Sequence, residues 1–284
     1  MSKPVLAGTE LLEQVAATQP DDEHLALWWL GQSGYLLRWR GVTVCVDPYL
    51  SDYLAVKHKG AQRTHERLTP APFEAAELTF CDLVVVSHKH PDHLDPVGLP
   101  ALLKASAEAL LVLPAPLADY ATGELGLPGE RVVPIRDGQV FEHKEVRVNA
   151  VAAAHPKLTL DAEGNSRALS YVLDCDPLRA LFVGGTVPYR EQHDKLAAFR
   201  PQLAALPISG RDARRQALGL PGNLTIAEAA RMAAELAAEC VLPNHWGMFA
   251  DNSADPDEFV THCAEHHPQL KPVVLQPGQR WQWP

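Results

Sequence analysis

The segment VVVSHKHPDHLDP, residues 84–96, carries three histidines and two aspartates directly after an apolar run. His88 and His90 lie two positions apart, so in an extended backbone both imidazoles point to the same side. A proline then interrupts the strand, which lets Asp92 and His93 turn toward a neighbouring point. Imidazoles and a carboxylate at this spacing form a ligand set for a borderline divalent metal. A polar loop with surface histidines is the alternative.

Two later histidines follow predicted strands in the same way and are candidates to complete the site. His155 ends the segment VNAVAAAH, and His245 follows VLPN. Either one alone would be an ordinary histidine at a strand end. Asp47 ends another predicted strand and is a candidate to orient a ligating histidine through its second ring nitrogen. Asp95 is a candidate for the same role, or for capping the helix that follows it.

The predicted elements that must position these residues are strands near the start of the chain and a mixture of strands and helices further on. Tryptophan, tyrosine and valine with glycine turns predict three strands in LALWWLGQSGYLLRWRGVTVCVDPYL, and residues 51–74 predict a long surface loop of the kind that often covers binding sites. A capping box of Thr225 and Glu228 opens the best-defined predicted helix, residues 225–239. The other predicted helices cover residues 9–17, 97–108, 115–124, 189–198 and 256–266, and the other predicted strands cover residues 82–87, 110–113, 131–135, 145–153, 168–173, 179–183, 240–243 and 273–275.

Strand-rich blocks beside alternating strands and helices predict two sheets flanked by helices, a four-layer αββα sandwich. Neither an internal repeat nor a low-complexity linker interrupts the sequence, so a single domain over residues 1–284 is expected, with residues 1–22 as an N-terminal helical extension.

Composition limits the classes of function. The chain has 284 residues and a formal charge of −10, which disfavours a nucleic-acid surface because such a surface needs a concentrated basic face. It has neither an apolar run of membrane-spanning length nor the apolar core of a signal peptide at its start. Five scattered cysteines without a CxxC pair fit reduced thiols. We therefore expect a cytoplasmic enzyme with a small-molecule substrate and no nucleic-acid or membrane partner, and a homo-oligomer is compatible with this sequence.

The motif HxHxDH after a buried strand, with later strand-end histidines, resembles the metallo-β-lactamase superfamily. More narrowly, LWWLGQSGYLL, VCVDPYL, SHKHPDHLD and GNLTIAEAARMAAELAAECVLPNHWGMF are similar to segments of the L-ascorbate-6-phosphate lactonase family. The likeness covers most of residues 25–260. It implies the metallo-β-lactamase fold and two adjacent metal positions. The residues that would hold the first position are His88, His90 and His155, and those that would hold the second are Asp92, His93 and His245.

One departure from the superfamily pattern concerns the number of metals. Relatives carry a Gly-Asp-Thr or Gly-Asp-Ser turn whose aspartate bridges both ions, whereas this chain reads GGT with Gly185 in that place. Two divalent ions repel each other, and a bridging carboxylate offsets part of that repulsion. We therefore expect one tight zinc or manganese site and a weak second site, which Gly185→Asp should strengthen. The alternative is a bridging carboxylate from elsewhere, such as Asp47 or Asp95.

A metal held by three neutral histidines lowers the pKa of its bound water, and the resulting hydroxide attacks an ester, lactone, amide or phosphodiester. The predicted function is hydrolysis, most specifically of a small anionic sugar-derived lactone, with Asp92 as general base if the second position is empty. The alternatives are a phosphodiesterase or amidase of the same superfamily, or a weakly active or non-catalytic metal-binding homologue. Arg211, in a predicted loop with two further arginines, is a candidate to hold an anionic group of the substrate. The candidates to shape the pocket are Tyr189, Asn244 and Trp246.

Overall fold

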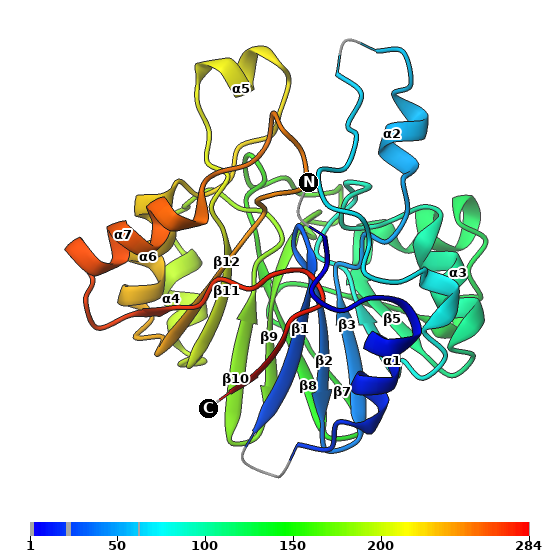
Figure 1. Ribbon diagram of the computed structural model, residues 1–284. Helices are drawn as coiled ribbons and strands as arrows, with labels where there is room; N and C mark the ends of the chain where they lie inside the picture. The colour runs from blue at the N-terminus through cyan, green and yellow to red at the C-terminus, as the bar shows by residue number, and fades with distance from the viewer. Residues whose placement is uncertain (1–2, 21–23, 62, 284) are drawn as a thin grey trace.

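The structure, a computed structural model, describes residues 3–20, 24–61 and 63–283 (Figure 1). Within these residues two sheets of seven strands each pack face to face, and helices cover both outer faces. This arrangement confirms the four-layer αββα sandwich that the sequence predicts.

The first sheet is mixed, with antiparallel pairs on one side of β3 and parallel pairs on the other. Its described strands, in spatial order, are β14 (Arg280–Trp283), β1 (Leu25–Gly31), β2 (Gly34–Trp39), β3 (Val42–Val46), β4 (Leu83–Val85), β5 (Leu110–Pro114) and β6 (Val132–Ile135).

The second sheet is also mixed, with antiparallel pairs from β7 to β10 and parallel pairs from β10 to β13. Its described strands, in spatial order, are β13 (Lys271–Pro272), β12 (Cys240–Asn244), β11 (Leu203–Pro207), β10 (Leu178–Phe182), β9 (Leu169–Cys175), β8 (Val146–Ala152) and β7 (Val140–His143).

Three apolar clusters hold the four layers together. The first lies between the sheets and joins residues such as Trp29 and Tyr35 to Tyr171 and Phe182. The second packs helices against the first sheet, and the third packs helices against the second sheet. Burial of apolar area on both faces of each sheet explains why β1, β2 and β3 are buried at every position instead of alternating. The helices are α1 (Gly8–Ala17), α2 (Tyr53–Lys57), α3 (Gly98–Ala105), α4 (Gln192–Ala197), α5 (Ala213–Ala217), α6 (Ile226–Glu235) and α7 (Pro256–His266).

Most predicted helices and strands form, with differences that have local causes. The predicted helix at 115–124 is helical but not a regular α-helix, since it consists of a 3₁₀ turn, Ala115–Leu117, and a π turn, Tyr120–Glu124. The predicted loop at 51–74 contains α2. The strand predicted at 273–275 is wrong, since the chain pairs at β13 and β14 on either side of it. The N-terminal segment contains α1, whose Leu11 and Val15 pack on the first sheet. No helix within the described residues is long and apolar enough to cross a membrane.

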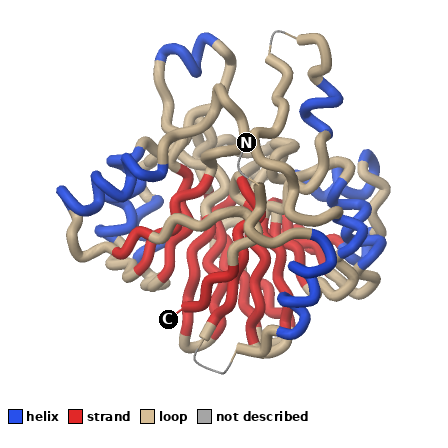
Figure 2. The backbone as a smooth tube through the Cα atoms, in the orientation of Figure 1, coloured by secondary structure: helices blue, strands red, loops and turns tan. Residues whose placement is uncertain are grey.

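The topology brings several strand ends to one edge of the sandwich, where loops gather (Figure 2). In the first sheet β1, β3 and β4 run in the same direction, and in the second sheet β8, β10 and β12 do so. The carboxyl ends of these six strands are followed by the residues that build the site described next. The loop carrying α2 and the loop carrying α5 stand above this edge on opposite sides (Figure 1).

Candidate metal centre

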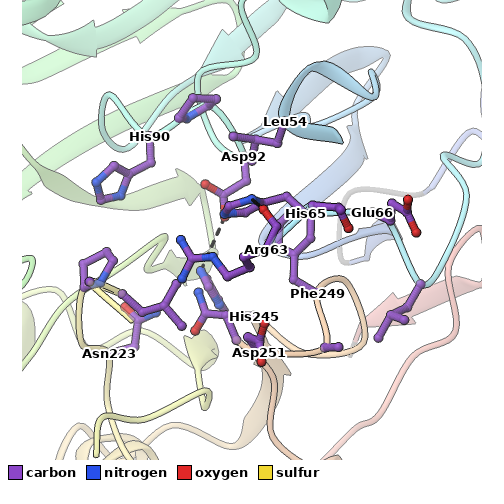
Figure 3. Close-up of a pocket in the computed structure, with 18 of the residues that line it drawn as sticks. Leu54, Arg63, His65, Glu66, His90, Asp92, Asn223, His245, Phe249 and Asp251 are labelled. Atoms are coloured by element: carbon purple, nitrogen blue, oxygen red, sulfur yellow. Dashed lines mark hydrogen bonds and ion pairs between the residues drawn. The ribbon is translucent and has the colours of Figure 1, made fainter. Parts of the chain in front are cut away.

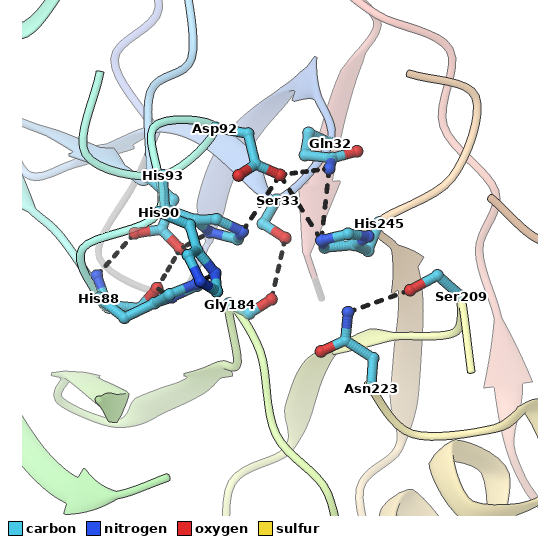
Figure 4. Close-up of polar contacts among 12 residues, drawn as sticks. Gln32, Ser33, His88, His90, Asp92, His93, Gly184, Ser209, Asn223 and His245 are labelled. Atoms are coloured by element: carbon cyan, nitrogen blue, oxygen red, sulfur yellow. Dashed lines mark hydrogen bonds and ion pairs between the residues drawn. The ribbon is translucent and has the colours of Figure 1, made fainter. Parts of the chain in front are cut away.

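The six predicted ligands meet in two adjacent groups at this edge. His88, His90 and His155 form one group, and Asp92, His93 and His245 form the other. In each group the atoms able to bind a metal lie within 4.8 Å of one another. The groups adjoin, because the ring centroids of His88 and His93 are 4.1 Å apart. Figure 4 shows how the HxHxDH turn and His245 face each other across this space.

Neighbouring groups orient the rings of the first group. Nδ1 of His88 lies 2.9 Å from the Ser87 hydroxyl, and Nδ1 of His155 lies 3.1 Å from the Gly222 carbonyl oxygen. These contacts leave Nε2 of both rings for a metal. Nε2 of His88 and Nδ1 of His90 lie 2.9 Å apart, so both point to one place. The group is therefore arranged as three imidazole ligands around a common point.

The second group has the dimensions of a metal site. Oδ2 of Asp92 lies 3.7 Å from Nε2 of His93 and 3.7 Å from Nε2 of His245. Two ligands about 2.1 Å from a tetrahedral ion would stand about 3.4 Å apart, so only a small adjustment is needed. Nε2 of His93 is buried and has no hydrogen-bond partner among the described residues, which fits an atom that binds a metal. The donor set of imidazoles and one carboxylate suits zinc or manganese.

The electrostatics of the site favour neutral histidines. Burial, together with the neighbouring histidines, holds the pKa of His88 and of His155 well below the ordinary value. Burial lowers the pKa of His245 to about 4. Burial also opposes ionisation of Asp92, but the charges of His93 and His245 outweigh it and hold its pKa below the usual range. His93 differs, because burial lowers its pKa but the neighbouring carboxylates Asp92 and Asp47 outweigh this and raise it. Apart from His93, the centre therefore presents uncharged imidazoles and one carboxylate, and a metal bound at the second group would take the place of a His93 proton.

Asp47 orients the second group, in the position that the sequence predicts for it. Its carboxylate accepts hydrogen bonds from the Ser87 backbone N–H at 2.7 Å and the Ser87 hydroxyl at 2.6 Å, and it contacts Nδ1 of His93 at 2.7 Å. The last contact fixes the proton on Nδ1 and leaves Nε2 of His93 free. A side chain at Gly184 would collide with Asp47 and Ser87, so a glycine is required there.

Asp95 has the capping role instead of a contact with a ligand. Oδ1 accepts hydrogen bonds from the backbone N–H groups of Val97 at 3.0 Å and Gly98 at 2.9 Å, at the start of α3. Oδ2 accepts from the backbone N–H groups of Leu50 and Ser51. Asp95 thus ties the loop after β3 to α3. The contacts that Asp47 makes with Ser87 and His93 do not reach the first group, so neither carboxylate takes the place of the bridging aspartate.

A cavity of about 430 Å³ opens onto both metal-binding groups (Figure 3). His90 and His155 line it from the first group, and Asp92 and His245 line it from the second. The loop between β3 and β4, predicted to cover a binding site, supplies one wall of the cavity. The residues that this loop contributes are Leu54, Arg63, Thr64, His65, Glu66 and Leu68.

The four residues predicted to bind substrate lie outside this lining. Arg211 makes two hydrogen bonds of 2.6 Å to Glu228 at the start of α6. The Tyr189 hydroxyl donates to the Ala152 carbonyl, and Asn244 donates to the Val183 carbonyl. Trp246 stacks on Trp29 with ring centroids 4.6 Å apart. Each of these side chains thus has a partner within the protein framework.

Three residues of the site were missed in the sequence. Gln32 follows β1 and donates a hydrogen bond to Asp92; a strand-end position, the signal used for the histidines, would have found it. Arg63 lines the cavity from a loop without a clear sequence pattern. Asn223 is among the residues that line the cavity, and its buried Oδ1 has no hydrogen-bond partner within the part of the chain that the structure describes. Its place just before the capping box of α6 gave no signal of function.

Gly185 lies against the first group. A Cβ atom there would lie 2.9 Å from the His155 ring and 3.1 Å from Oδ1 of Asn223. Distances under about 3 Å require a neighbour to move, so the site is closely packed around the missing side chain. The residues around Gly185 therefore pack closely against a glycine and not against the aspartate that the superfamily pattern has at this position.

Residues 43–246 match the family described as the beta-lactamase superfamily domain, which covers the ligand-bearing strands of both sheets. The chain belongs to the beta-lactamase superfamily. Among curated proteins it is similar to the probable L-ascorbate-6-phosphate lactonase UlaG of Escherichia fergusonii, with 26% identity over 98% of this chain and 86% of that protein. A corresponding protein of Salmonella newport is 25% identical over the same shares.

Solved structures share the superfamily fold. Igni18, described as a metallo hydrolase from Ignicoccus hospitalis, superimposes with a TM-score of 0.68 and 18% identity over 92% of this chain and 99% of its own. An isothiocyanate hydrolase from Delia radicum gut bacteria superimposes with a TM-score of 0.71 and 16% identity over 90% and 98%. At these identities the structures establish the fold alone. Family membership and the two His/Asp groups together support a metal-dependent hydrolase of this superfamily.

Proposed function

We propose that the protein is a metal-dependent lactonase that opens a small anionic lactone. The observation that carries the proposal is a cavity in which both metal-binding groups face one arginine, Arg63. Its volume of about 430 Å³ lies within the range of small-molecule sites. The similarity over nearly the whole chain to a probable lactonase of a phosphorylated sugar acid supports the same substrate class.

Arg63 is suited to bind the anionic group of the substrate. Its guanidinium donates a hydrogen bond of 3.0 Å to the Leu218 carbonyl, and no carboxylate among the described residues pairs with it. By contrast Arg211, Arg214 and Arg215 pair with Glu228, Asp251 and Asp212, respectively. Arg63 therefore keeps N–H groups for a phosphate or carboxylate.

Apolar residues in the lining of the cavity suit the carbon skeleton of a small ring. Leu54, Leu220 and Phe249 contribute apolar surface, and Asn223 contributes an amide oxygen without a partner among the described residues. An amide oxygen accepts a hydrogen bond from a substrate hydroxyl. This combination of an apolar wall, an acceptor and a cation at the metal centre supports a hydroxylated anionic lactone.

A divalent metal bound here would polarise the carbonyl oxygen and acidify a water. The chain's own residues orient the reactants: Arg63 would hold the anionic end and Asn223 a hydroxyl. Asp92 stays ionised and accepts a hydrogen bond from Gln32. Because its pKa lies below the usual range, it is a weak proton acceptor, which argues against the predicted role of general base. Ring opening adds one water across the acyl–oxygen bond and yields a hydroxyl and a carboxylate, with release of one proton.

The test is a substrate panel on metal-loaded protein, read by proton release: a phosphorylated sugar lactone, a neutral lactone, a phosphodiester and an amide. We expect turnover of the anionic lactone, and its loss in His90→Ala. Arg63→Gln should raise KM for the anionic lactone about 10- to 100-fold and leave the neutral lactone unchanged. Arg231→Gln, on the exposed side of α6, is the matched control. Turnover confined to the phosphodiester or amide would instead establish the corresponding alternative.

A further inference from the structure

Gln32 stands at the second metal-binding group, although it is not one of the predicted ligands. Its side chain is fully buried. Nε2 donates a hydrogen bond of 2.7 Å to Oδ2 of Asp92 and lies 3.3 Å from Nε2 of His245. Figure 4 shows the amide nitrogen between these two side chains. The two atoms that it contacts are the ones through which Asp92 and His245 would bind an ion.

The amide is held in this place by its backbone. Gln32 has a φ of 53° and His245 a φ of 61°, both in the left-handed region that non-glycine residues rarely adopt. The Gln32 carbonyl accepts a hydrogen bond of 2.9 Å from the His245 N–H and one of 3.2 Å from the Trp29 indole. The loop after β1 and the ligand loop after β12 are thus joined at this residue, and strained backbone of this kind concentrates at functional sites.

The two ends of the amide are used unequally. Nε2 contacts the two ligands, whereas Oε1 is buried and finds no hydrogen-bond donor within the described ranges. Leaving a buried acceptor without a partner is unfavourable, so the contacts made by Nε2 must outweigh that cost. An ion bound to Asp92 and His245 would meet the positive end of the amide dipole, and the hydrogen bonds would have to break.

We propose that Gln32 restricts the second metal position, its amide N–H group standing where a cation would otherwise be bound. Together with the missing carboxylate at Gly185, this leaves the protein with one tightly bound metal ion, held by His88, His90 and His155. The inference concerns metal occupancy and is independent of the substrate. Gln32 is a positioning residue, since it contacts ligands and not the reacting atoms.

Two substitutions distinguish the effect of the amide N–H donor of Gln32 from the effect of the volume that its side chain occupies. Gln32→Leu removes the amide and keeps a side chain of similar size, so zinc should bind Asp92, His93 and His245 about tenfold more tightly. Gln32→Glu has nearly the same shape but supplies a carboxylate in place of the amide. It should bind a second zinc more tightly than Gln32→Leu, with release of a proton at neutral pH.

A matched control is available in Gln192, which is also buried and also has an Oε1 without a partner among the described residues. Its Nε2 donates to the Thr186 hydroxyl and not to a ligand. Gln192→Leu therefore makes the same chemical change and should leave both zinc affinities unaltered.

The experiment is titration of chelator-stripped full-length protein with zinc and, separately, manganese, by calorimetry and by metal analysis after desalting. Native protein should retain close to one ion, and Gln32→Glu close to two. Second-site affinity that is unchanged or lower in both Gln32 variants would overturn the proposal, because Gln32 would then be neutral or itself a ligand. Two tight ions in native protein would overturn it as well. Gln32→Glu preserves side-chain shape and tests the idea if Gln32→Leu fails to fold.

Discussion

Asp47 is the residue whose replacement tests most directly how the protein framework prepares the metal centre. Its buried carboxylate accepts hydrogen bonds from the Ser87 backbone N–H and hydroxyl and contacts Nδ1 of His93 at 2.7 Å. Asp47→Asn is the suitable change, because position 47 has a φ of 41° and asparagine tolerates that region. The variant keeps the shape and removes the charge.

The magnitude follows from which groups face the carboxylate. Oδ1 accepts from the Ser87 N–H, so an asparagine oxygen placed there turns its NH₂ group toward His93. His93 must then give up its proton on Nδ1 and carry it on Nε2, the atom that would bind the metal. We expect zinc affinity at the second group to fall about 10- to 100-fold. Loss of about one charge-assisted hydrogen bond should lower the free energy of unfolding by about 1.5–3 kcal/mol.

The assay is zinc titration of Asp47→Asn together with urea unfolding. Asp95→Asn is the control, since Asp95 is equally buried and hydrogen-bonded but contacts Ser51 and the start of α3. It should lower stability to a similar degree and leave zinc affinity unchanged. If Asp47→Asn kept native zinc affinity at the second group, orientation of His93 by Asp47 would be refuted. If Asp95→Asn weakened zinc binding equally, the effect would be one of general destabilisation.

Two further predictions concern α6 and Gly185. Arg211 and Thr225 hold the pKa of Glu228 at about 2 against the opposing effect of burial. Its carboxylate therefore contributes stability above its ordinary pKa of 4.5, and this contribution is lost as the pH falls toward 2. Glu228→Gln should cost about 1 kcal/mol in urea unfolding at pH 7 and much less at pH 3, whereas an equal cost at both pH values would contradict the ion pair. The superfamily pattern predicts that Gly185→Asp strengthens the second site, but the packing changes that expectation. The new Cβ would lie only 2.9 Å from the His155 ring, so Gly185→Asp should displace His155 and weaken zinc binding at the first group; a gain of a second tight ion without loss of the first would contradict this.

The sequence by itself predicted the sandwich and the two groups of candidate ligands, because both depend on local patterns. Buried strands are read from apolar runs, and the HxHxDH spacing fixes which side chains can share a metal. His155 and His245 were accessible to the same reasoning, because the carboxyl ends of strands that run in one direction reach the same edge of the sandwich.

Only the tertiary structure decided the role of each remaining polar side chain. The sequence singled out Arg211 and gave no signal for Arg63, whereas the fold paired Arg211 with Glu228 and placed Arg63 in the cavity. Gln32 contacts Asp92 across 60 positions of the chain and His245 across 213. Such contacts depend on how β1 and β12, from different sheets, end beside each other. No sequence pattern within β1 or β12 encodes how close their ends lie, because that distance arises from the packing of the two sheets.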